Sequence, residues 1–389
     1  MIMPEVQDIL KLYGEEYLKK HPMTPEQYKA FMSILNCRTA SLGGHVDECD
    51  ECGHTQITYN SCRNRHCPKC QTLLKEKWID ARKEELLPVP YFHVVFTIPE
   101  ELNMIVYQNQ EKMYKILFDA VAGTLMELTA DPEHLGALIG LTAILHTWGQ
   151  NLLFHPHLHC LIPFGGLTPE GQFIVGRDNF FIHVKVLSEY FMGKFLDMLK
   201  NAYNNNELKF YGSIAEYAND QCFEALVKGL YLKDWVVFSR ETFTGPEAVL
   251  DYLGRYTRRV CISNNRILNI EDGSVTFKYK DYRDGSKIKE MTITAEEFIR
   301  RFLMHILPQG FMKTRYYGLM SNRNRGSKLK QCQQLADYQS PKAQFKDLLA
   351  VEIIKIITGK DVTLCPSCQK GKLKTVRTLV KGVPPSLTA

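Results

Sequence analysis

The spacing of apolar residues predicts two short helices at the start of the chain. Between residues 4 and 35, apolar side chains recur at the three- and four-residue intervals of a helix with one buried face. Thr24 and Pro25 mark the start of the second helix, because threonine caps a first turn and proline fits the first helical position. A charged helix is predicted over residues 72–87, just before Pro88.

The pattern changes at residue 91, where apolar runs predict strands among the helices. Residues 91–98 have the character of a buried strand that Pro99 closes, and residues 104–128 that of one long amphipathic helix. Further strands are predicted at 141–150, 156–163 and 235–238, a hairpin at 275–279 and 288–293, and helices at 250–257 and 296–307. Strands and helices do not alternate regularly, which favours an α+β fold over a βαβ series.

The cysteines add a metal-binding module to this picture. The chain has 12 cysteines, and half of them stand in Cys-x-x-Cys pairs. The N-terminus is acidic, whereas a signal peptide begins with basic residues followed by an apolar run. No apolar stretch of the sequence is long enough to span a bilayer. We therefore expect a cytoplasmic protein whose cysteine pairs bind metal instead of forming disulfides.

The strongest cysteine signal lies in a Gly/Cys/His-rich stretch from residue 37 to residue 70. Two Cys-x-x-Cys pairs are separated there by fourteen residues, and two such knuckles complete a tetrahedral sulfur site. We predict one structural zinc ion at this site. Its predicted ligands are Cys49, Cys52, Cys67 and Cys70.

Other candidate zinc ligands lie nearby and in the tail. Cys62 and His66 are near enough to join this site or to build a second one, and an ordinary surface role is an equal alternative. Cys365 and Cys368 form half of a site in the tail. This pair could borrow ligands from the N-terminal cluster, form a separate site or be an empty thiol pair. A redox pair is disfavoured because no strand-to-helix junction is indicated.

A second kind of metal site is predicted on the strand at 156–163. Alternate residues of a strand share a face, so His157 and His159 point the same way while Leu158 enters the core. Two imidazoles side by side form a ready pair of metal ligands. The third ligand is one of His146, Gln150 and His155. We favour the first of these, because a short hairpin would bring it beside His157.

Tyr252 and Tyr256 are the candidate nucleophiles. Residues four apart lie on one face of a helix, so both hydroxyl groups would project together. A phenol, with a pKa of about 10, attacks poorly at neutral pH unless a metal polarises the phosphate and nearby cations offset the charge. Tyrosines at this spacing are more often core residues. The His-x-His strand and the basic surroundings favour the catalytic interpretation here.

The charge distribution favours a polyanionic partner. The net charge is +5, but residues 251–330 hold 17 Lys and Arg against 8 Asp and Glu. A basic segment of this size suits nucleic acid. The candidate DNA contacts in it are Arg255, Arg258, Arg259, Arg323 and Arg325.

Five motifs in this order resemble those of the insertion sequence 91 family of transposases, which are rolling-circle enzymes with two catalytic tyrosines. They are SCRNRHCPKCQ at 61–71, FHVVFTIP at 92–99, HTWGQ at 146–150 with HPHLHC at 155–160, YLGRYT at 252–257, and YGLMSNR at 317–323. Each motif alone is modest evidence. Together they span most of the chain and are highly specific.

The resemblance implies a ferredoxin-like HUH nuclease fold, in which helices flank an antiparallel sheet, behind a helical and zinc-binding module. It divides the chain into N-terminal helices (1–36), a zinc-binding domain (37–90), a catalytic domain (91–330) and a tail with a Cys-x-x-Cys pair (331–389). His157 and His159, with His146 as the favoured third ligand, would hold Mg²⁺ or Mn²⁺. Tyr252 or Tyr256 would attack single-stranded DNA at transposon ends and targets, giving a 5′-phosphotyrosine.

The resemblance also implies a bacterial enzyme. Because the sequence contains no helicase motif, we expect host helicase or replication proteins to separate the strands. Three other functions compete with it. A plasmid or phage rolling-circle replication initiator shares the histidine and tyrosine motifs. A non-catalytic zinc-dependent DNA-binding regulator would use the histidines structurally. A hydrolytic zinc enzyme would use water as the nucleophile, although no His-Glu-x-x-His helix supports it.

Overall fold

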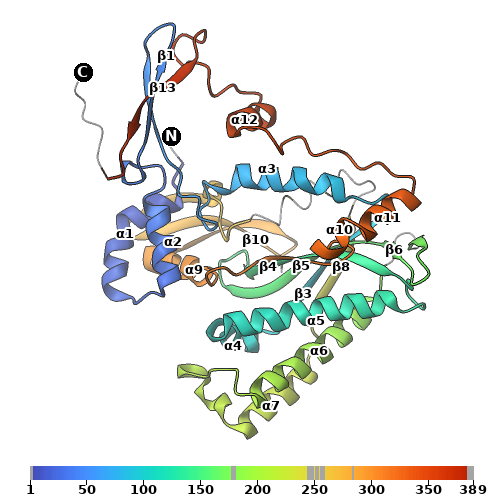
Figure 1. The fold of residues 1–389 in the computed structure, drawn as a ribbon. Coiled ribbons are helices and arrows are strands. Elements are labelled where there is room, and N and C mark those ends of the chain that lie inside the picture. The colour runs from blue at the N-terminus through green and yellow to red at the C-terminus, as the bar shows by residue number, and fades with distance from the viewer. Residues whose placement is uncertain are drawn as a thin grey trace.

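The fold is a mixed α+β arrangement built on a large antiparallel sheet (Figure 1). It is seen in a computed structural model that describes residues 3–176, 181–242, 249, 254, 259–282 and 284–382. The strand order of the sheet is β7-β6-β4-β5-β3-β8, and β12 also pairs with β4. Its strands are β3 (Tyr91–Thr97), β4 (Leu138–Trp148), β5 (Phe154–Pro163), β6 (Gly165–Leu167), β7 (Phe173–Val175), β8 (Val237–Thr242) and β12 (Thr314–Gly318).

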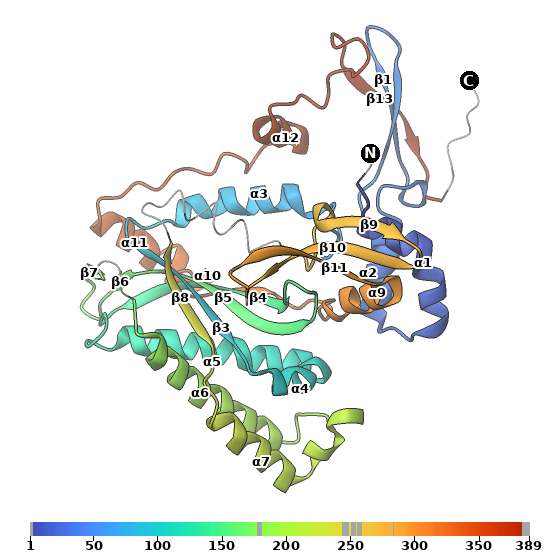
Figure 2. The ribbon, with the colours of Figure 1, turned by 180° about the vertical axis from the view of Figure 1, so that it is seen from behind.

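One face of this sheet is covered by a layer of helices (Figures 1 and 2). They are α4 (Asn103–Gln108), α5 (Gln110–Ala130) and α6 (Val184–Asn204), and α7 (Asp220–Tyr231) lies beyond α6. Leu158, Cys160 and Ile162 of β5 enter the core between the sheet and these helices, with Phe118 and Phe191 packed among them. Burying each large apolar side chain in this way contributes about 1.5–3 kcal/mol.

The opposite face of the sheet packs against α3 (Gln71–Arg82) and the elements that follow β12. Ile144 and Leu161 from the sheet share a second apolar core with Leu87 and with Val249. Ile79 of α3 lies at its edge. The short helices α10 (Asn322–Arg325) and α11 (Lys328–Leu335) complete this side.

The N-terminal helices share a third core with a segment near the middle of the basic region. The helices are α1 (Val6–Lys20) and α2 (Pro25–Leu35), and they pack against β9 (Ile267–Glu271), β10 (Ser274–Asp281), β11 (Lys287–Thr294) and α9 (Ala295–Met304). Phe31 of α2 and Phe277 of β10 are both fully buried in this core. The helices α1 and α2 therefore pack as one unit with β9, β10, β11 and α9.

A small three-stranded sheet stands apart from these cores. Its order is β13-β1-β2, with β1 (Gly44–Cys49), β2 (Thr55–Tyr59) and β13 (Leu373–Leu379). Figures 1 and 2 show this sheet beyond α1 and α2, with α12 (Ala350–Thr358) between it and α3. The tail thus returns to the N-terminal region of the chain.

Most helices and strands predicted from periodicity are confirmed. The predicted helix start at Thr24 is confirmed, because the Thr24 Oγ1 accepts a hydrogen bond from the Gln27 N–H at 3.2 Å. The predicted long helix at 104–128 is two helices, since the Asn109 side chain bonds the Ile105 and Lys209 carbonyl oxygens where the chain turns. The strands that were not predicted are β1, β2, β6, β7, β9, β12 and β13. The predicted helix at 250–257 lies outside the described residues except for Gly254.

Among described residues, no helix is long and apolar enough to cross a membrane.

Candidate functional site

Three histidines converge on the sheet face opposite to α5 and α6. In the β4–β5 pairing, His146 stands directly opposite His157, and His159 stands opposite Ile144. One ring nitrogen from each of His146, His157 and His159 lies within 4.8 Å of the others. The Nε2 atoms of His157 and His159 are 3.1 Å apart.

The strand geometry explains why these rings share a face. His157 and His159 alternate with Leu158 and Cys160, which are fully buried in the core under α5 and α6. The ring of His146 is held by Trp148, whose ring lies 4.6 Å away at an interplanar angle of 21°. The rings are therefore positioned by the core on one side and by an aromatic neighbour on the other.

Burial keeps the imidazoles of His157 and His159 neutral. Desolvation lowers the pKa of His157 from 6.5 to about 3. Desolvation likewise lowers the pKa of His159 well below its ordinary value. The neighbouring His146 and His157 lower the pKa of His159 further. The charge of Arg259 is a smaller cause at both histidines. A neutral imidazole offers its lone pair to a metal ion, so this environment fits a ligand set.

A fourth histidine supports the first three and was missed by the sequence reasoning. The Nε2 atom of His93 on β3 lies 2.8 Å from Nδ1 of His159, and the rings are parallel within 7°. In a metal site, such a contact fixes which nitrogen of the ligand faces the ion. His93 stands in the predicted strand at 91–98 and in the motif FHVVFTIP, and these were the signals that could have pointed to it.

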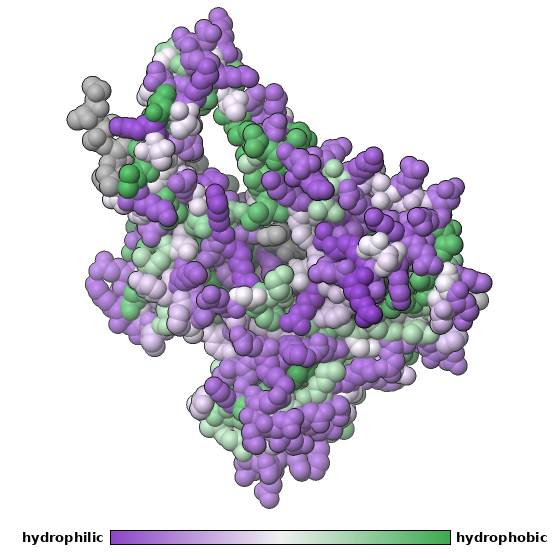
Figure 3. All heavy atoms as spheres, in the orientation of Figure 1, coloured by the Kyte–Doolittle hydropathy of each residue, from purple (hydrophilic) through white to green (hydrophobic). Residues whose placement is uncertain are grey.

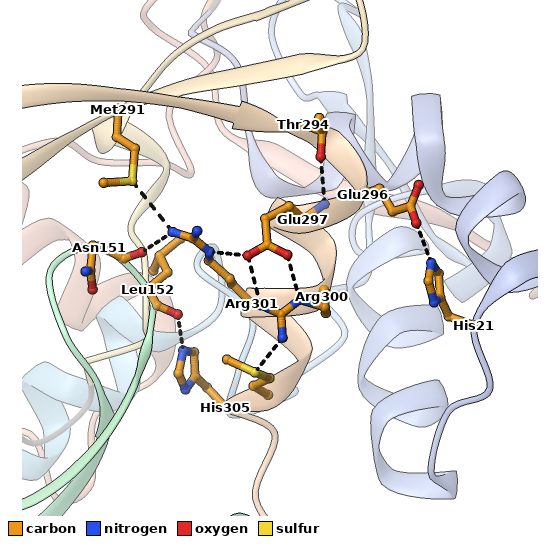
Figure 4. Close-up of polar contacts among 11 residues, drawn as sticks. His21, Asn151, Leu152, Met291, Thr294, Glu296, Glu297, Arg300, Arg301 and His305 are labelled. Carbon is orange, nitrogen blue, oxygen red and sulfur yellow. Dashed lines mark hydrogen bonds and ion pairs between the residues drawn. The ribbon is translucent and has the colours of Figure 1, made fainter. Parts of the chain in front are cut away.

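The turn between β4 and β5 is fixed by α9 (Figure 4). A guanidinium nitrogen of Arg301 donates to the Asn151 carbonyl oxygen at 2.9 Å. The Nε2 atom of His305 lies 3.0 Å from the Leu152 carbonyl oxygen, and its Nδ1 lies 3.1 Å from Oγ1 of Thr147. These contacts set the turn that brings His146 beside His157.

The other two candidates for the third metal ligand lie differently. His155 belongs to the same strand, and its carbonyl oxygen accepts a hydrogen bond from Nδ1 of His157 at 2.7 Å. Its side chain is exposed and stands outside the group of converging nitrogens. The carbonyl oxygen of Gln150 accepts a hydrogen bond from Arg266. The arrangement favours His146.

The tail and the N-terminal stretch together bring eight cysteines into two groups of four. The first group is Cys37, Cys62, Cys67 and Cys70, and the second is Cys49, Cys52, Cys365 and Cys368. Within each group, the sulfur atoms all lie within 4.8 Å of one another. Four thiols in a tetrahedral cluster are the donor set of a structural zinc site.

This grouping corrects the prediction of a single site from Cys49, Cys52, Cys67 and Cys70. Each Cys-x-x-Cys pair is a half-site as expected, but the two N-terminal pairs belong to different groups. The pair at Cys67 and Cys70 meets Cys37 from the end of α2 and the candidate ligand Cys62. Cys37 stands in no Cys-x-x-Cys pair, which is why it was overlooked.

Of the remaining candidate zinc ligands, the tail cysteines belong to the second group and His66 belongs to neither group. Cys365 and Cys368 meet Cys49 and Cys52, which is the first of the three alternatives for the tail pair. The Nε2 atom of His66 accepts a hydrogen bond from the Leu307 N–H at 3.4 Å, and burial lowers the pKa of His66 to about 3. This residue packs the zinc-bearing loop against the segment after α9.

The predicted nucleophiles Tyr252 and Tyr256 lie outside the described residues. Two residues of the same stretch are described. Val249 is buried in the core that contains Ile144 and Leu161, on the sheet face where the three histidines converge. A Cβ at Gly254 would lie 2.5 Å from Cδ1 of Ile79 in α3. The backbone at Gly254 therefore lies directly against α3.

Comparison with known proteins identifies the chain. It matches a family model described as "Putative transposase" over residues 140–328, and one described as "Transposase zinc-binding domain" over residues 9–98. It is 48% identical over 383 residues to "Putative transposase y4qJ" of Sinorhizobium fredii (strain NBRC 101917 / NGR234), covering 96% of this chain and 95% of that protein. The chain belongs to the insertion sequence 91 family of transposases.

A second relative of this transposase is the "Transposase for insertion sequence element IS801" of Pseudomonas savastanoi pv. phaseolicola. The two are 28% identical over 294 residues, which is 75% of this chain and 69% of that protein. No solved structure matches the chain. The family identity means that the transposase cleaves and joins DNA, and that zinc belongs to its N-terminal region.

The candidate DNA contacts of the transposase differ in their surroundings. Arg255 and Arg258 lie outside the described residues, and Arg323 is exposed on α10. Arg259 lines a cavity of about 160 Å³ together with Lys75 and Arg266. Arg325 is engaged within the protein, because its guanidinium pairs with Glu85 at 3.1 Å and donates to the Met320 carbonyl oxygen. A DNA contact by Arg325 stays a prediction, and these bonds also give this side chain a structural role.

Proposed function

We propose that this transposase nicks and joins single-stranded DNA through a 5′-phosphotyrosine intermediate, as an HUH nuclease in rolling-circle-type transposition. The observation that carries the proposal is the convergence of His146, His157 and His159 on one face of an antiparallel sheet. The buried Val249, close in sequence to the tyrosines, packs on that same face.

The three histidines would hold the catalytic divalent cation. Their nitrogens are close enough to bind one ion, and burial keeps two of the rings in the neutral form that metal binding requires. When bound, Mg²⁺ or Mn²⁺ supplies Lewis-acid polarisation of the scissile phosphate. Imidazole is a better ligand for Mn²⁺ than for Mg²⁺, so we expect Mn²⁺ to bind more tightly.

Tyr252 or Tyr256 would act as the nucleophile. The phenolic oxygen attacks phosphorus and forms a tyrosine–phosphate ester, while the bond from phosphorus to the 3′-oxygen breaks. The phenolic proton passes to solvent, and the departing oxygen takes up a proton to become a 3′-hydroxyl. The ester keeps the phosphodiester energy, so rejoining needs no nucleotide cofactor. A second tyrosine lets one residue hold the donor end while the other cuts another strand.

Arg259 is placed to offset negative charge at the phosphate. Its charge acts on the pKa of both His157 and His159, so it lies near the proposed metal site. The cavity that it lines with Lys75 and Arg266 gives the DNA backbone a basic surface. Phosphate contacts of this kind position the strand without reading its sequence. Strand separation would come from host helicase or replication proteins.

The catalytic domain would be the ferredoxin-like unit within residues 91–330. Its support is the antiparallel sheet with β5 between β3 and β4 and with helices on one face. The zinc-binding domain (37–90) and the N-terminal helices (1–36) precede this unit, and the tail (331–389) follows it.

A covalent-adduct assay tests the proposal. The full chain is incubated with labelled single-stranded DNA from the element ends and Mn²⁺, and the products are separated on a denaturing gel. We expect label migrating with the protein, lost in the Tyr252→Phe, Tyr256→Phe double variant. Tyr211→Phe is the matched control, because Tyr211 is a 64% exposed tyrosine on a distant loop.

Each other outcome identifies a competing function. Cleavage without an adduct would indicate hydrolysis by activated water. Binding without cleavage would indicate a DNA-binding regulator. A replication initiator would form the same adduct, so a strand-transfer assay on element ends distinguishes it from a transposase. The family match favours strand transfer.

A further inference from the structure

The second cysteine group joins two parts of the chain that are more than 300 residues apart. The sulfur of Cys49 lies 3.7 Å from that of Cys368, and the sulfur of Cys52 lies 3.7 Å from that of Cys365. A tetrahedral zinc site with Zn–S bonds of about 2.3 Å places its sulfurs about 3.8 Å apart. A disulfide needs about 2.05 Å. The spacing fits zinc and excludes two disulfides.

We propose that this group binds a second structural zinc ion, which clasps the C-terminal tail to the N-terminal hairpin of β1 and β2. The zinc-binding family match ends at residue 98, so it includes only half of these ligands. The first cysteine group is complete without the tail. The proposal is independent of the catalytic chemistry.

The two halves of the site have the same local geometry. In the first half, the Gly53 N–H donates to the Cys49 carbonyl oxygen at 3.1 Å. In the second half, the Gln369 N–H donates to the Cys365 carbonyl oxygen at 3.0 Å. Both donors follow the second cysteine and have a left-handed φ, of 66° and 54° respectively. Each turn thus presents a pair of sulfurs to the other, as two knuckles do around one metal.

The knuckles are also fitted to each other. A Cβ at Gly371 would lie 2.4 Å from the Cys49 sulfur, so glycine is needed where the tail crosses the first knuckle. The Gly371 N–H donates to the Cys368 sulfur at 3.4 Å. Asp50, inside the first knuckle, accepts a hydrogen bond from the Lys372 N–H at 2.7 Å and pairs with Lys374 at 3.2 Å.

The small sheet around this site needs such a clasp, because it has almost no core of its own. Most residues of β2 and β13 are exposed, and within the described part of the chain none belongs to the three apolar cores. In Figure 3, the tip of this sheet is covered mainly by hydrophilic residues. Small sheets without an apolar face are marginally stable in water, so a metal site must supply the stability.

With the second zinc site formed, the tail is a strap that crosses α3 and is held at both ends. After α11, the tail runs along this helix and the turn that follows it. The Phe345 N–H donates to Asp80 of α3 at 2.6 Å, and the Ser340 hydroxyl donates to the Glu84 carbonyl oxygen just after α3 at 3.1 Å. Figures 1 and 2 show α12 over α3 and the tail continuing to β1. The helix α3 also contacts Gly254, between the proposed nucleophiles. Loss of the second zinc would release one end of this strap.

Metal content tests the proposal directly. Zinc per chain is measured by elemental mass spectrometry on the full-length protein after gel filtration. We expect two zinc ions in the natural protein and one in the Cys365→Ser, Cys368→Ser variant. Cys222→Ser is the control, since this cysteine lies on α7 outside both groups, and it should keep two. One zinc in the natural protein, or two in the double variant, overturns the proposal.

A second variant covers the case in which loss of thiols disturbs folding generally. Gly371→Ala keeps every cysteine but crowds the Cys49 sulfur, so it should also lower the content to one zinc. Gly326→Ala, where a Cβ meets nothing within 4 Å, should keep two. Limited proteolysis should then cut residues 336–372 at least tenfold faster in the two one-zinc variants. Equal cleavage rates would contradict the clasp.

Discussion

The Nε2 atom of His93 lies 2.8 Å from Nδ1 of His159, while the other nitrogen of His159 faces His157 at 3.1 Å. This geometry assigns the two nitrogens of one imidazole to different partners. If a metal binds at Nε2 of His159, Nδ1 of His159 carries the proton and donates a hydrogen bond to His93. His93 is then a positioning residue for the metal site.

The first prediction concerns this contact. His93→Ala should weaken Mn²⁺ binding about 10- to 100-fold, which is the usual effect of removing the hydrogen-bond partner of a ligating histidine. His93→Gln should recover part of the affinity, because an amide oxygen can accept the same proton. The measurement is a Mn²⁺ titration of the zinc-loaded protein followed by electron paramagnetic resonance. Natural affinity in the alanine variant would rule out the positioning role.

The second prediction separates the three candidates for the third ligand. His146→Ala should reduce Mn²⁺ affinity at least tenfold, because its nitrogen lies within 4.8 Å of those of His157 and His159. His155→Ala and Gln150→Ala should bind Mn²⁺ as the natural protein does. The same titration measures all three, and thermal melting checks that each variant is folded. A loss in Gln150→Ala with retention in His146→Ala would reverse the assignment.

The third prediction concerns the ion pairs of α9, which also anchor the β4–β5 turn. The hydrogen bonds from Arg300, and then those from Arg301, lower the pKa of Glu297 from 4.5 to about 2. A folded-state pKa below the ordinary value stabilises the protein above pH 4.5, and this contribution disappears as the pH falls from 4.5 to 2.

Glu297→Gln should therefore lower Tm at pH 7 by about 1–3 °C, because partly exposed pairs contribute little. The variant should also lose less Tm than the natural protein between pH 5 and pH 3. Glu170→Gln, in an exposed turn before β7, is the control and should follow the natural protein. Parallel melting curves for Glu297→Gln and the natural protein over this range would refute the role of Glu297.

The fourth prediction concerns the end of β12. Gly318 has a φ of 57°, and a Cβ there would lie 1.9 Å from the Ile139 carbonyl oxygen. Gly318→Ala should cost more than about 2 kcal/mol of unfolding free energy, because it adds a backbone clash to the cost of a left-handed residue. Gly310→Ala, with a φ of 73° and open space, should cost only about 1–2 kcal/mol.

Urea unfolding of the two variants gives this comparison. If both alanine substitutions cost the same, the close approach of β12 to β4 does not constrain Gly318.

Local patterns predicted much of the fold. Periodicity located α1, α2, β3, β5 and the β10–β11 hairpin, since these depend on which side of a single element is buried. The strands β1, β2 and β13 escaped prediction because they bury few side chains and leave no apolar pattern. The strand β12 escaped it because its residues are all half-buried and do not alternate.

The sequence by itself determined what each short motif offers. Spacing two on a strand puts His157 and His159 on one face, and each Cys-x-x-Cys places two sulfurs on one turn. Only the tertiary structure decided the partners of these motifs. Cys49 and Cys52 meet Cys365 and Cys368 because the tail pairs with β1. His146 and His93 reach the face of the proposed metal site through the registers of β4 and β3 with β5. Local spacing fixes direction along one element, whereas contact between distant elements depends on packing that no short segment contains.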